Sequence, residues 1–116
     1  GNDRLSGGKG RDTLHGNNGR DTREGGAGND KLFGEAGADR FIFDDLSGDD
    51  RIRDFEANNN LEKIDLSAVT EITSFADLKV NHMSQVGKHV VIDDGTISIQ
   101  VDNVLLSEMN RGDFLF

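Results

Sequence analysis

Aspartates recur every nine residues near the start of the chain, and their carboxylates are the groups best suited to chemistry. Five residues follow this spacing: Asp3, Asp12, Asp21, Asp30 and Asp39. Each stands two residues after a glycine, and these glycines are Gly1, Gly10, Gly19, Gly28 and Gly37. The chain has no Cys, and His15, His82 and His89 show no ligand spacing. Regularly spaced carboxylates without nitrogen or sulfur partners therefore predict a site for a hard cation.

The same repeat predicts the elements that must hold these carboxylates. From residue 7 the chain divides into GGKGRDTLH, GNNGRDTRE, GGAGNDKLF and GEAGADRFI, after a truncated GNDRLS. The first six residues of a copy predict a tight turn with inward-pointing carbonyl groups, and the last three predict a short strand. The eighth position should face inward, and it is apolar in four of the five copies, as Leu5, Leu14, Leu32 and Phe41. Two copies therefore predict one coil of a flattened solenoid.

In such a solenoid, copies nine residues apart lie on opposite edges and copies eighteen residues apart stack. Asp3, Asp21 and Asp39 are expected along one edge, with Asp12 and Asp30 along the other. Stacked carboxylates repel each other unless a cation lies between them, and a cage made mostly of backbone carbonyls suits calcium better than magnesium. Ordinary Asx turns would explain one copy, but they do not explain the fixed spacing.

These copies resemble the GGxGxDxUx nonapeptides of RTX proteins, the hemolysin-type calcium-binding repeats, over residues 1–42. The resemblance implies an all-β fold, with a calcium-stabilised parallel β-roll over residues 1–43. Residues 44–116 are expected to form a β-rich capping subdomain that carries a type I secretion signal. In that family, each calcium ion lies between turns two copies apart. The earlier copy supplies the carbonyls of positions two and four and its Asp, and the later copy supplies those of positions one and three and its Asp.

Carried over to this chain, the resemblance implies about three to four calcium ions. One site takes Gly8, Gly10 and Asp12 with Gly25, Ala27 and Asp30. The opposite edge takes Asn17, Gly19 and Asp21 with Gly34, Ala36 and Asp39. A truncated third site takes Gly1 and Asp3 with Gly16, Asn18 and Asp21. A fourth takes Gly26, Gly28 and Asp30 with a partner after residue 43, for which the candidates are Asp45, Asp49, Asp50 and Asp54.

Three residues depart from the repeat. Asn17 and Glu35 replace glycine at the second position, where they can serve if only their carbonyl is used. Arg23 replaces the inward apolar residue, and a buried unpaired guanidinium is costly. We expect its side chain to reach along the sheet to Glu24 or Glu35, and the alternative is a local distortion of the roll. A guanidinium in the interior without an acid would contradict the predicted register.

The nine-residue spacing is lost after residue 41. Short strands are expected at Phe41–Phe43, Ile52–Phe55 and Ile64–Leu66, with a loop at 57–60. Ser74 and Asp77 resemble a capping box that opens a helix over Phe75–Asn81, with Phe75, Leu78 and Val80 towards the core. Residues 90–101 predict a hairpin around Asp94–Gly95, in which Asp93 and Asp94 serve the turn rather than a metal. The closing GDFLF predicts a final strand. This segment should carry most of the core.

Composition narrows the class of protein. Only 34% of the 116 residues are hydrophobic and 15 are glycine, so the small core needs an additional source of stability. The net charge of −9 is uneven: residues 1–53 hold nine Lys/Arg against eleven Asp/Glu, and residues 54–116 hold four against eleven. No apolar run is long enough to span a membrane. The chain opens in mid-repeat, so we expect more of the protein upstream.

No catalytic motif is visible: the chain lacks HExxH, a nucleophile elbow and a phosphate loop, and His82 and Ser84 have no identifiable partner. The resemblance implies a non-catalytic module like the C-terminal domains of serralysin-type proteases and mannuronan C5-epimerases. Such a module is secreted by the type I machinery of Gram-negative bacteria, folds on extracellular Ca²⁺ and supports an upstream domain. Nucleic acid is not an expected partner.

A second function stays open at the level of sequence. Basic residues at positions five and seven of the copies would form rows along the roll: Arg4, Arg11, Arg20, Lys31 and Arg40. With calcium bound, such rows could hold an anionic polysaccharide such as alginate. The simpler interpretation is that they are solvated charges beside acidic turns.

Overall fold

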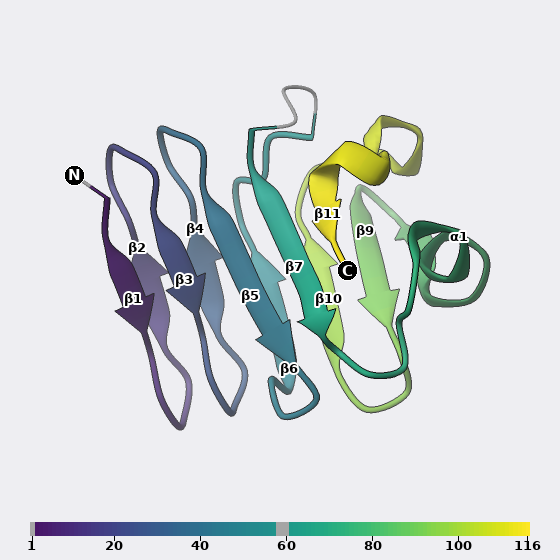
Figure 1. Cartoon of the computed structure of the whole chain (residues 1–116), viewed down its shortest axis with the longest axis horizontal. Helices are drawn as coiled ribbons and strands as arrows, with labels where there is room; N and C mark the ends of the chain where they lie inside the picture. Colours follow the sequence, from purple (N-terminus) through teal and green to yellow (C-terminus); the bar gives the residue numbers. More distant parts are fainter. Residues whose placement is uncertain (1, 58–60) are drawn as a thin grey trace.

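The computed structural model describes residues 2–57 and 61–116. It shows two β-sheets, and the chain passes alternately from one to the other (Figure 1). The first sheet has the order β1 (Arg4–Ser6), β3 (Thr22–Glu24), β5 (Arg40–Asp44), β7 (Lys63–Ala68) and β11 (Phe114–Leu115). The second has the order β2 (Thr13–His15), β4 (Lys31–Phe33), β6 (Asp49–Ile52), β10 (Ser98–Val101), β9 (His89–Asp93) and β8 (Met83–Val86). Strands β1 to β7 alternate between the sheets and pair in parallel, so the predicted β-roll is confirmed.

The register confirms that one coil takes two copies of the repeat. Leu5 lies opposite Arg23, and Leu14 lies opposite Leu32, eighteen residues apart in each case. The coil then lengthens, because Lys31 pairs with Arg51 and Arg40 pairs with Lys63. The roll therefore continues past the repeats, with extra residues accommodated in the turns.

The turns form two edges of the roll (Figure 1). The upper edge holds the loops 16–21 and 34–39, and the lower edge holds 7–12, 25–30 and 45–48. Asn17 and Glu35 adopt φ angles of 66° and 63°, in the same left-handed region as the glycines at this position in the neighbouring copies. These two turns therefore keep the shape of the glycine turns, at a cost of about 1–2 kcal/mol for a non-glycine residue.

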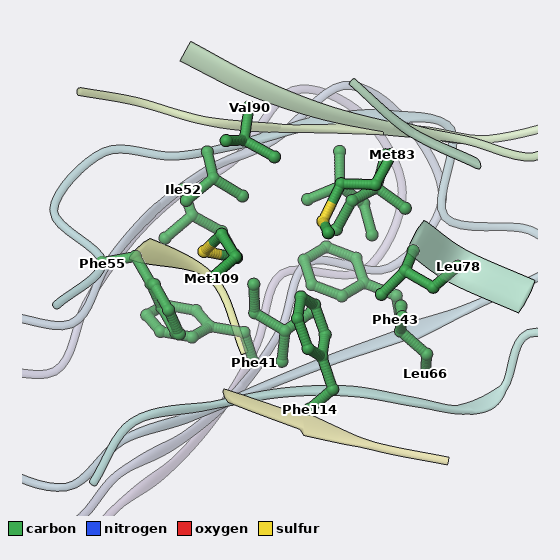
Figure 2. Packing of buried hydrophobic residues seen from close by; sticks show 14 of the residues in the cluster. Phe41, Phe43, Ile52, Phe55, Leu66, Leu78, Met83, Val90, Met109 and Phe114 are labelled. Carbon is green, nitrogen blue, oxygen red and sulfur yellow. The ribbon is translucent and has the colours of Figure 1, made fainter. Parts of the chain in front are cut away.

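The apolar core lies mainly after the repeats, as predicted. Among the described residues before position 43, the buried apolar side chains are Leu32 and Phe41, whereas Leu14 is only partly buried. Figure 2 shows the main cluster, in which the ring of Phe43 and the side chains around it fill the space between the sheets. The first coil is consequently poor in apolar contacts and needs another source of stability.

Two details of the later segment differ from the prediction. The strand expected at Ile52–Phe55 instead runs from Asp49 to Ile52, because Ile52 lies opposite Leu32 and the chain then leaves the sheet. Phe55 is still buried. Strand β8 was not predicted at all.

The helix was predicted correctly in place but not in every facing residue. Helix α1 (Phe75–Asp77) begins at the Ser74 cap, whose Oγ accepts from the N–H of Asp77, and continues as a π-helical turn, Leu78–His82. Leu78 is fully buried, whereas Val80 is 79% exposed. Val80 lies two residues beyond Leu78 and therefore on the opposite face of the helix.

The hairpin and the final strand are confirmed. Strands β9 and β10 pair around the turn, where Asp94 accepts from the N–H groups of Thr96 and Ile97. Short 3₁₀ turns, Leu106–Glu108 and Arg111–Asp113, then lead to β11, which pairs with β7. Residues 58–60 of the expected loop at 57–60 lie outside the described residues. No helix in the described residues is long and apolar enough to cross a membrane.

The stacking of turns can be tested with two matched glycines. Gly10 and Gly28 occupy the same repeat position on the same edge and both have positive φ, 104° and 128°. A Cβ on Gly28 would lie 1.9 Å from the carbonyl oxygen of Gly10, whereas a Cβ on Gly10 would meet nothing within 4 Å. We expect Gly10→Ala to cost about 1–2 kcal/mol of stability and Gly28→Ala a further ~1–3 kcal/mol.

Thermal unfolding followed by far-UV circular dichroism in saturating calcium would measure the difference. Equal losses for the two variants would show that the loops do not stack as closely as the structure indicates.

Candidate metal centre

The repeat aspartates form two columns of stacked carboxylates. On the lower edge, the N–H of Asp12 donates to Oδ1 of Asp30 at 2.8 Å, and the N–H of Asp30 donates to Oδ1 of Asp50 at 2.9 Å. On the upper edge, the N–H of Asp3 donates to Oδ1 of Asp21 at 2.7 Å, and that of Asp21 to Oδ1 of Asp39 at 3.0 Å. The structure therefore places the aspartates on the edges that the spacing predicts.

The second oxygen of most of these carboxylates has no protein partner. Within the described residues, four such atoms are buried and make no hydrogen bond: Oδ2 of Asp12, Asp30, Asp39 and Asp50. A buried carboxylate oxygen without a donor is strongly unfavourable unless the group is protonated or faces a cation. These columns are therefore built to face positive charge.

Backbone carbonyls line the gap between the lower loops 7–12 and 25–30. The carbonyl oxygens of Gly8 and Gly10 face the later loop, since a Cβ at Gly26 or Gly28 would lie 2.2 or 1.9 Å from them. The carbonyl of Gly25 faces back, 2.7 Å from the Cβ position of Gly7. The carbonyl of Ala27 accepts from the N–H of Gly10 at 2.9 Å and so also faces this gap.

All six predicted ligands of this first site are thus brought together: Gly8, Gly10, Asp12, Gly25, Ala27 and Asp30. Every one of them offers oxygen, and four of the six offer a neutral carbonyl. This donor set fits calcium, which accepts many oxygen ligands in a flexible cage. Within the described residues no group of three or more His, Cys, Asp or Glu forms a metal site, so a cation here would depend on the carbonyls.

The lower column continues beyond the repeats through Asp50. The carbonyl oxygen of Gly28 faces Gly48, whose Cβ would lie 2.2 Å away, and Asp50 stacks on Asp30. Of the other candidates for the fourth site, Asp45 accepts instead from Thr70, and the carboxylate of Asp54 belongs to the upper edge. The segment from Asp39 to Asp50 is two residues longer than a nine-residue repeat, and it still places an acid in the lower column.

An acid on the upper edge was missed by the repeat pattern. Glu62 precedes Lys63, which pairs with Arg40, so Glu62 takes the position that Asp39 holds one coil earlier. It is only 1% exposed, and its Oε1 has no hydrogen-bond partner within the described residues. A Cβ on Gly34 would lie 2.8 Å from this atom and 3.0 Å from Oδ2 of Asp39.

A short signal in the sequence could have found both later acids. An acidic, a basic and an apolar residue follow one another where a coil enters its strand: Asp30-Lys31-Leu32, Asp39-Arg40-Phe41, Asp50-Arg51-Ile52 and Glu62-Lys63-Ile64. This triplet survives when the glycines and the nine-residue spacing are lost.

Arg23 does not reach along the sheet as expected. Its side chain is fully buried inside the roll, with Nη2 3.4 Å from Oδ2 of Asp21 and Nη1 3.3 Å from Oδ1 of Asp39. The acids expected to bind it have other partners, since Glu24 pairs with Arg4 and Glu35 with His15. The buried guanidinium lies beside two aspartates, so the predicted register holds. The predicted position of the Arg23 side chain was wrong.

The truncated third site is only partly described. Gly1 lies outside the described residues, while Asp3 stacks on Asp21. Gly16 lies beside Asp21, where a Cβ would sit 2.6 Å from Oδ2, and Asn18 forms a parallel bridge with Ala36 of the next upper loop. These residues therefore lie at the stacked turns where they were predicted.

Burial raises the pKa of three acids in the two columns, Asp30, Asp50 and Glu62. Burial raises the pKa of Asp50 to about 7, and the charges of Asp30 and Asp49 add to the rise. Burial likewise raises the pKa of Glu62 to about 7, with the carboxylate of Asp39 as the largest charge acting on it. The pKa of Asp30 is raised by burial and by Asp12. Asp50 and Glu62 therefore stay partly protonated near neutral pH when no cation faces them.

Comparison with known proteins agrees with this geometry. A family described as RTX calcium-binding nonapeptide repeat (4 copies) matches residues 1–22 and 16–45. No match is found among curated protein sequences. Two solved structures show the same fold.

The first is the extracellular lipase LipA from Serratia marcescens, with a TM-score of 0.73 and 20% identity over 97% of this chain and 20% of the lipase. The second is the AlgE6R3 subunit of the mannuronan C5-epimerase from Azotobacter vinelandii, with a TM-score of 0.59 and 24% identity over 99% of this chain and 78% of that one. The chain thus spans a small part of the lipase. Its N-terminal copies, residues 1–45, are RTX calcium-binding nonapeptide repeats.

Proposed function

We propose that this chain is a module that folds on binding extracellular calcium and supports the secretion, folding and stability of a larger protein. One observation carries the proposal: the lower column Asp12, Asp30 and Asp50 buries three carboxylate oxygens that have no hydrogen-bond partner in the described part of the chain. The raised pKa values of Asp30 and Asp50 support it, because burial disfavours the charged form of these carboxyls unless positive charge lies nearby.

Two lower-edge sites are proposed. Loops 7–12 and 25–30 would hold one ion through Asp12 and Asp30, and loops 25–30 and 45–50 would hold a second through Asp30, Asp50 and the carbonyls of Gly26 and Gly28. Bound calcium would supply the positive charge that offsets the paired carboxylates. The buried pair Asp39 and Glu62 offers a third, upper-edge position.

The poor core of the first coil explains why folding would depend on the ion. Leu5 and Leu14 are only partly buried, so these strands gain little from apolar contact. The stacked carboxylates oppose their assembly in the absence of a cation. Cytosolic calcium is low, so the repeats would stay unfolded inside the cell and fold outside it, where binding and folding become one free-energy event.

The later segment has a different proposed role. Residues 44–116 supply most of the apolar core and would cap the roll, and their C-terminal end would be read by the type I secretion machinery while unfolded. The likeness to an extracellular lipase and to a mannuronan C5-epimerase subunit supports a place in a secreted enzyme. The module itself is proposed to be non-catalytic, with the active site in an upstream domain.

Calcium should control the fold of the repeats. We expect the β signal in far-UV circular dichroism to rise with calcium, with a midpoint of about 10⁻⁴ to 10⁻³ M as in extracellular modules. Asp30 serves both lower sites, so Asp30→Asn should raise the midpoint about tenfold or more. Asp93→Asn, which removes an exposed charge from the hairpin turn and keeps an oxygen for the N–H of Gly95, should leave it nearly unchanged.

EGTA provides the opposing test. A spectrum that does not change when EGTA removes calcium would contradict the proposed function, and equal midpoints for the two variants would contradict the lower-edge sites.

Calcium binding should depend on pH between about 5 and 8. Where strand β6 stays paired with β10 in the calcium-free protein, Asp50 holds a proton up to about pH 7, whereas an unfolded chain releases it near its ordinary pKa of 3.8. Calcium-free stability should therefore fall as pH rises through this window, while calcium affinity should rise and level off above about pH 8. Below the raised pKa, affinity should drop up to about tenfold per pH unit for each proton displaced.

Isothermal titration calorimetry in buffers of different ionisation enthalpy would count the protons released at pH 6.5. Asp50→Asn should reduce this count, and a pH-independent affinity without proton release would contradict the role of Asp50.

Binding of an anionic polysaccharide is a second candidate. A groove on the first sheet beside the upper loops is lined by Arg20, Arg40 and Lys63, together with Asp21 and Asp39. The register aligns Arg4, Thr22, Arg40 and Lys63 in one row across the sheet. Arg40 already pairs with Asp65, which weakens its availability for a ligand.

Titration with alginate oligomers in calcium, followed by NMR, would test this second function. Binding should shift the amide signals around Arg20 and Arg40, and Arg20→Ala should weaken it. Arg111→Ala, far along the chain near the C-terminal strand, is the matched control. An absence of shifts along the row would leave the calcium-dependent folding function alone.

A further inference from the structure

We infer that Arg23 takes the place of a calcium ion between the upper loops 16–21 and 34–39. The inference rests on the proposed calcium-binding function of the roll, because it concerns which stacked turns bind the ion. The resemblance to RTX repeats assigns this gap a calcium site made by Asn17, Gly19, Asp21, Gly34, Ala36 and Asp39. The residues present in the structure do not fit that assignment.

The guanidinium of Arg23 already contacts three of those six ligands. Nη2 donates to the carbonyl oxygen of Gly34 at 2.9 Å and lies 3.4 Å from Oδ2 of Asp21. Nη1 lies 3.3 Å from Oδ1 of Asp39. The fork of one side chain thus spans both carboxylates and the carbonyl that the earlier and later turns would otherwise offer to an ion.

A calcium ion and this guanidinium cannot share the gap. Calcium binds oxygen at about 2.3–2.6 Å, so an ion on these oxygens would lie within contact distance of the Arg23 nitrogens and would repel them. The side chain has no exposed surface, and its guanidinium carbon lies 5.6 Å from the centre of the Phe41 ring. It is therefore packed in place by the core rather than free to leave for solvent.

The lower edge provides the contrast. Arg23 follows the upper loop 16–21 at the inward position of its strand, and the same position after the lower loops 7–12 and 25–30 holds Leu14 and Leu32. Leucine offers no charge to the lower carboxylates, and there Oδ2 of Asp12 and Asp30 lacks a partner in the described residues. On the upper edge Oδ2 of Asp21 accepts from Arg23, whereas Oδ2 of Asp39, which lies beside Gly34 with Oε1 of Glu62, has no such partner. One substitution in the repeat thus separates a gap that needs calcium from a gap that carries its own cation.

The number of bound ions tests the inference. Wild-type protein and Arg23→Leu, which restores the residue type of the neighbouring copies, would be compared by native mass spectrometry and by equilibrium dialysis in saturating calcium. Arg23→Leu should bind one more calcium ion than the wild type. Arg23→Lys keeps a cation inside and should show no gain, and Arg20→Leu, which removes an exposed charge from the same loop, should show none either.

The outcomes separate this inference from the proposed function. If no variant binds calcium, the proposed function fails; if the wild type binds calcium and Arg23→Leu binds the same number, the inference alone fails. Should Arg23→Leu not fold, a crystal structure of the wild type grown in calcium decides. Guanidinium density between Asp21 and Asp39 supports the inference, and a calcium peak at that position overturns it.

Discussion

The need for positive charge between stacked carboxylates governs the rest of this structure. A coil of eighteen residues places each aspartate on the one before it, and a backbone N–H then holds one carboxylate oxygen in the column. The carboxylates cannot swing out to water without losing that bond, so the other oxygen stays buried. The glycine carbonyls that face the same gaps complete an oxygen cage. The roll is therefore a fold in which the ion-binding geometry and the backbone geometry are one arrangement.

Two sources of stability meet along the axis of the roll. At one end, the three-residue strands of the repeats enclose little apolar surface; at the other, Phe43, Leu66 and Leu78 are fully enclosed, at roughly 25 cal/mol per Å² of buried apolar area. The sheets run without a break from one to the other, since Leu32 lies opposite Ile52 and Phe41 opposite Ile64. The apolar end thus provides a formed sheet edge on which the repeat strands can pair.

The parts of the fold that the sequence predicted are those in which the repeat is strictly local. Strands β1 to β4, the two edges and the columns of aspartates all follow from the nine-residue spacing. Asp50 could not be chosen among four acids, and Glu62 was missed, because longer turns break the spacing while strand register preserves the position. Arg23 was misplaced because Asp39 is sixteen residues away in sequence and only the stacking of coils brings it near. A local sequence pattern predicts the periodic strands and turns well. Contacts between stacked coils can be identified only once the roll is assembled.

Arginine and calcium can both supply the positive charge that stacked carboxylates need, but with different consequences. A guanidinium carries one positive charge, is attached to the chain and remains charged at any physiological pH. Calcium carries two charges and is present only where the medium supplies it. Arg23 lies over Phe41, the first aromatic residue of the apolar core, so the gap that carries its own cation adjoins the apolar end of the roll. Dependence on calcium therefore falls most heavily on the lower edge and on the outermost coil, where neither an internal cation nor a full core is available.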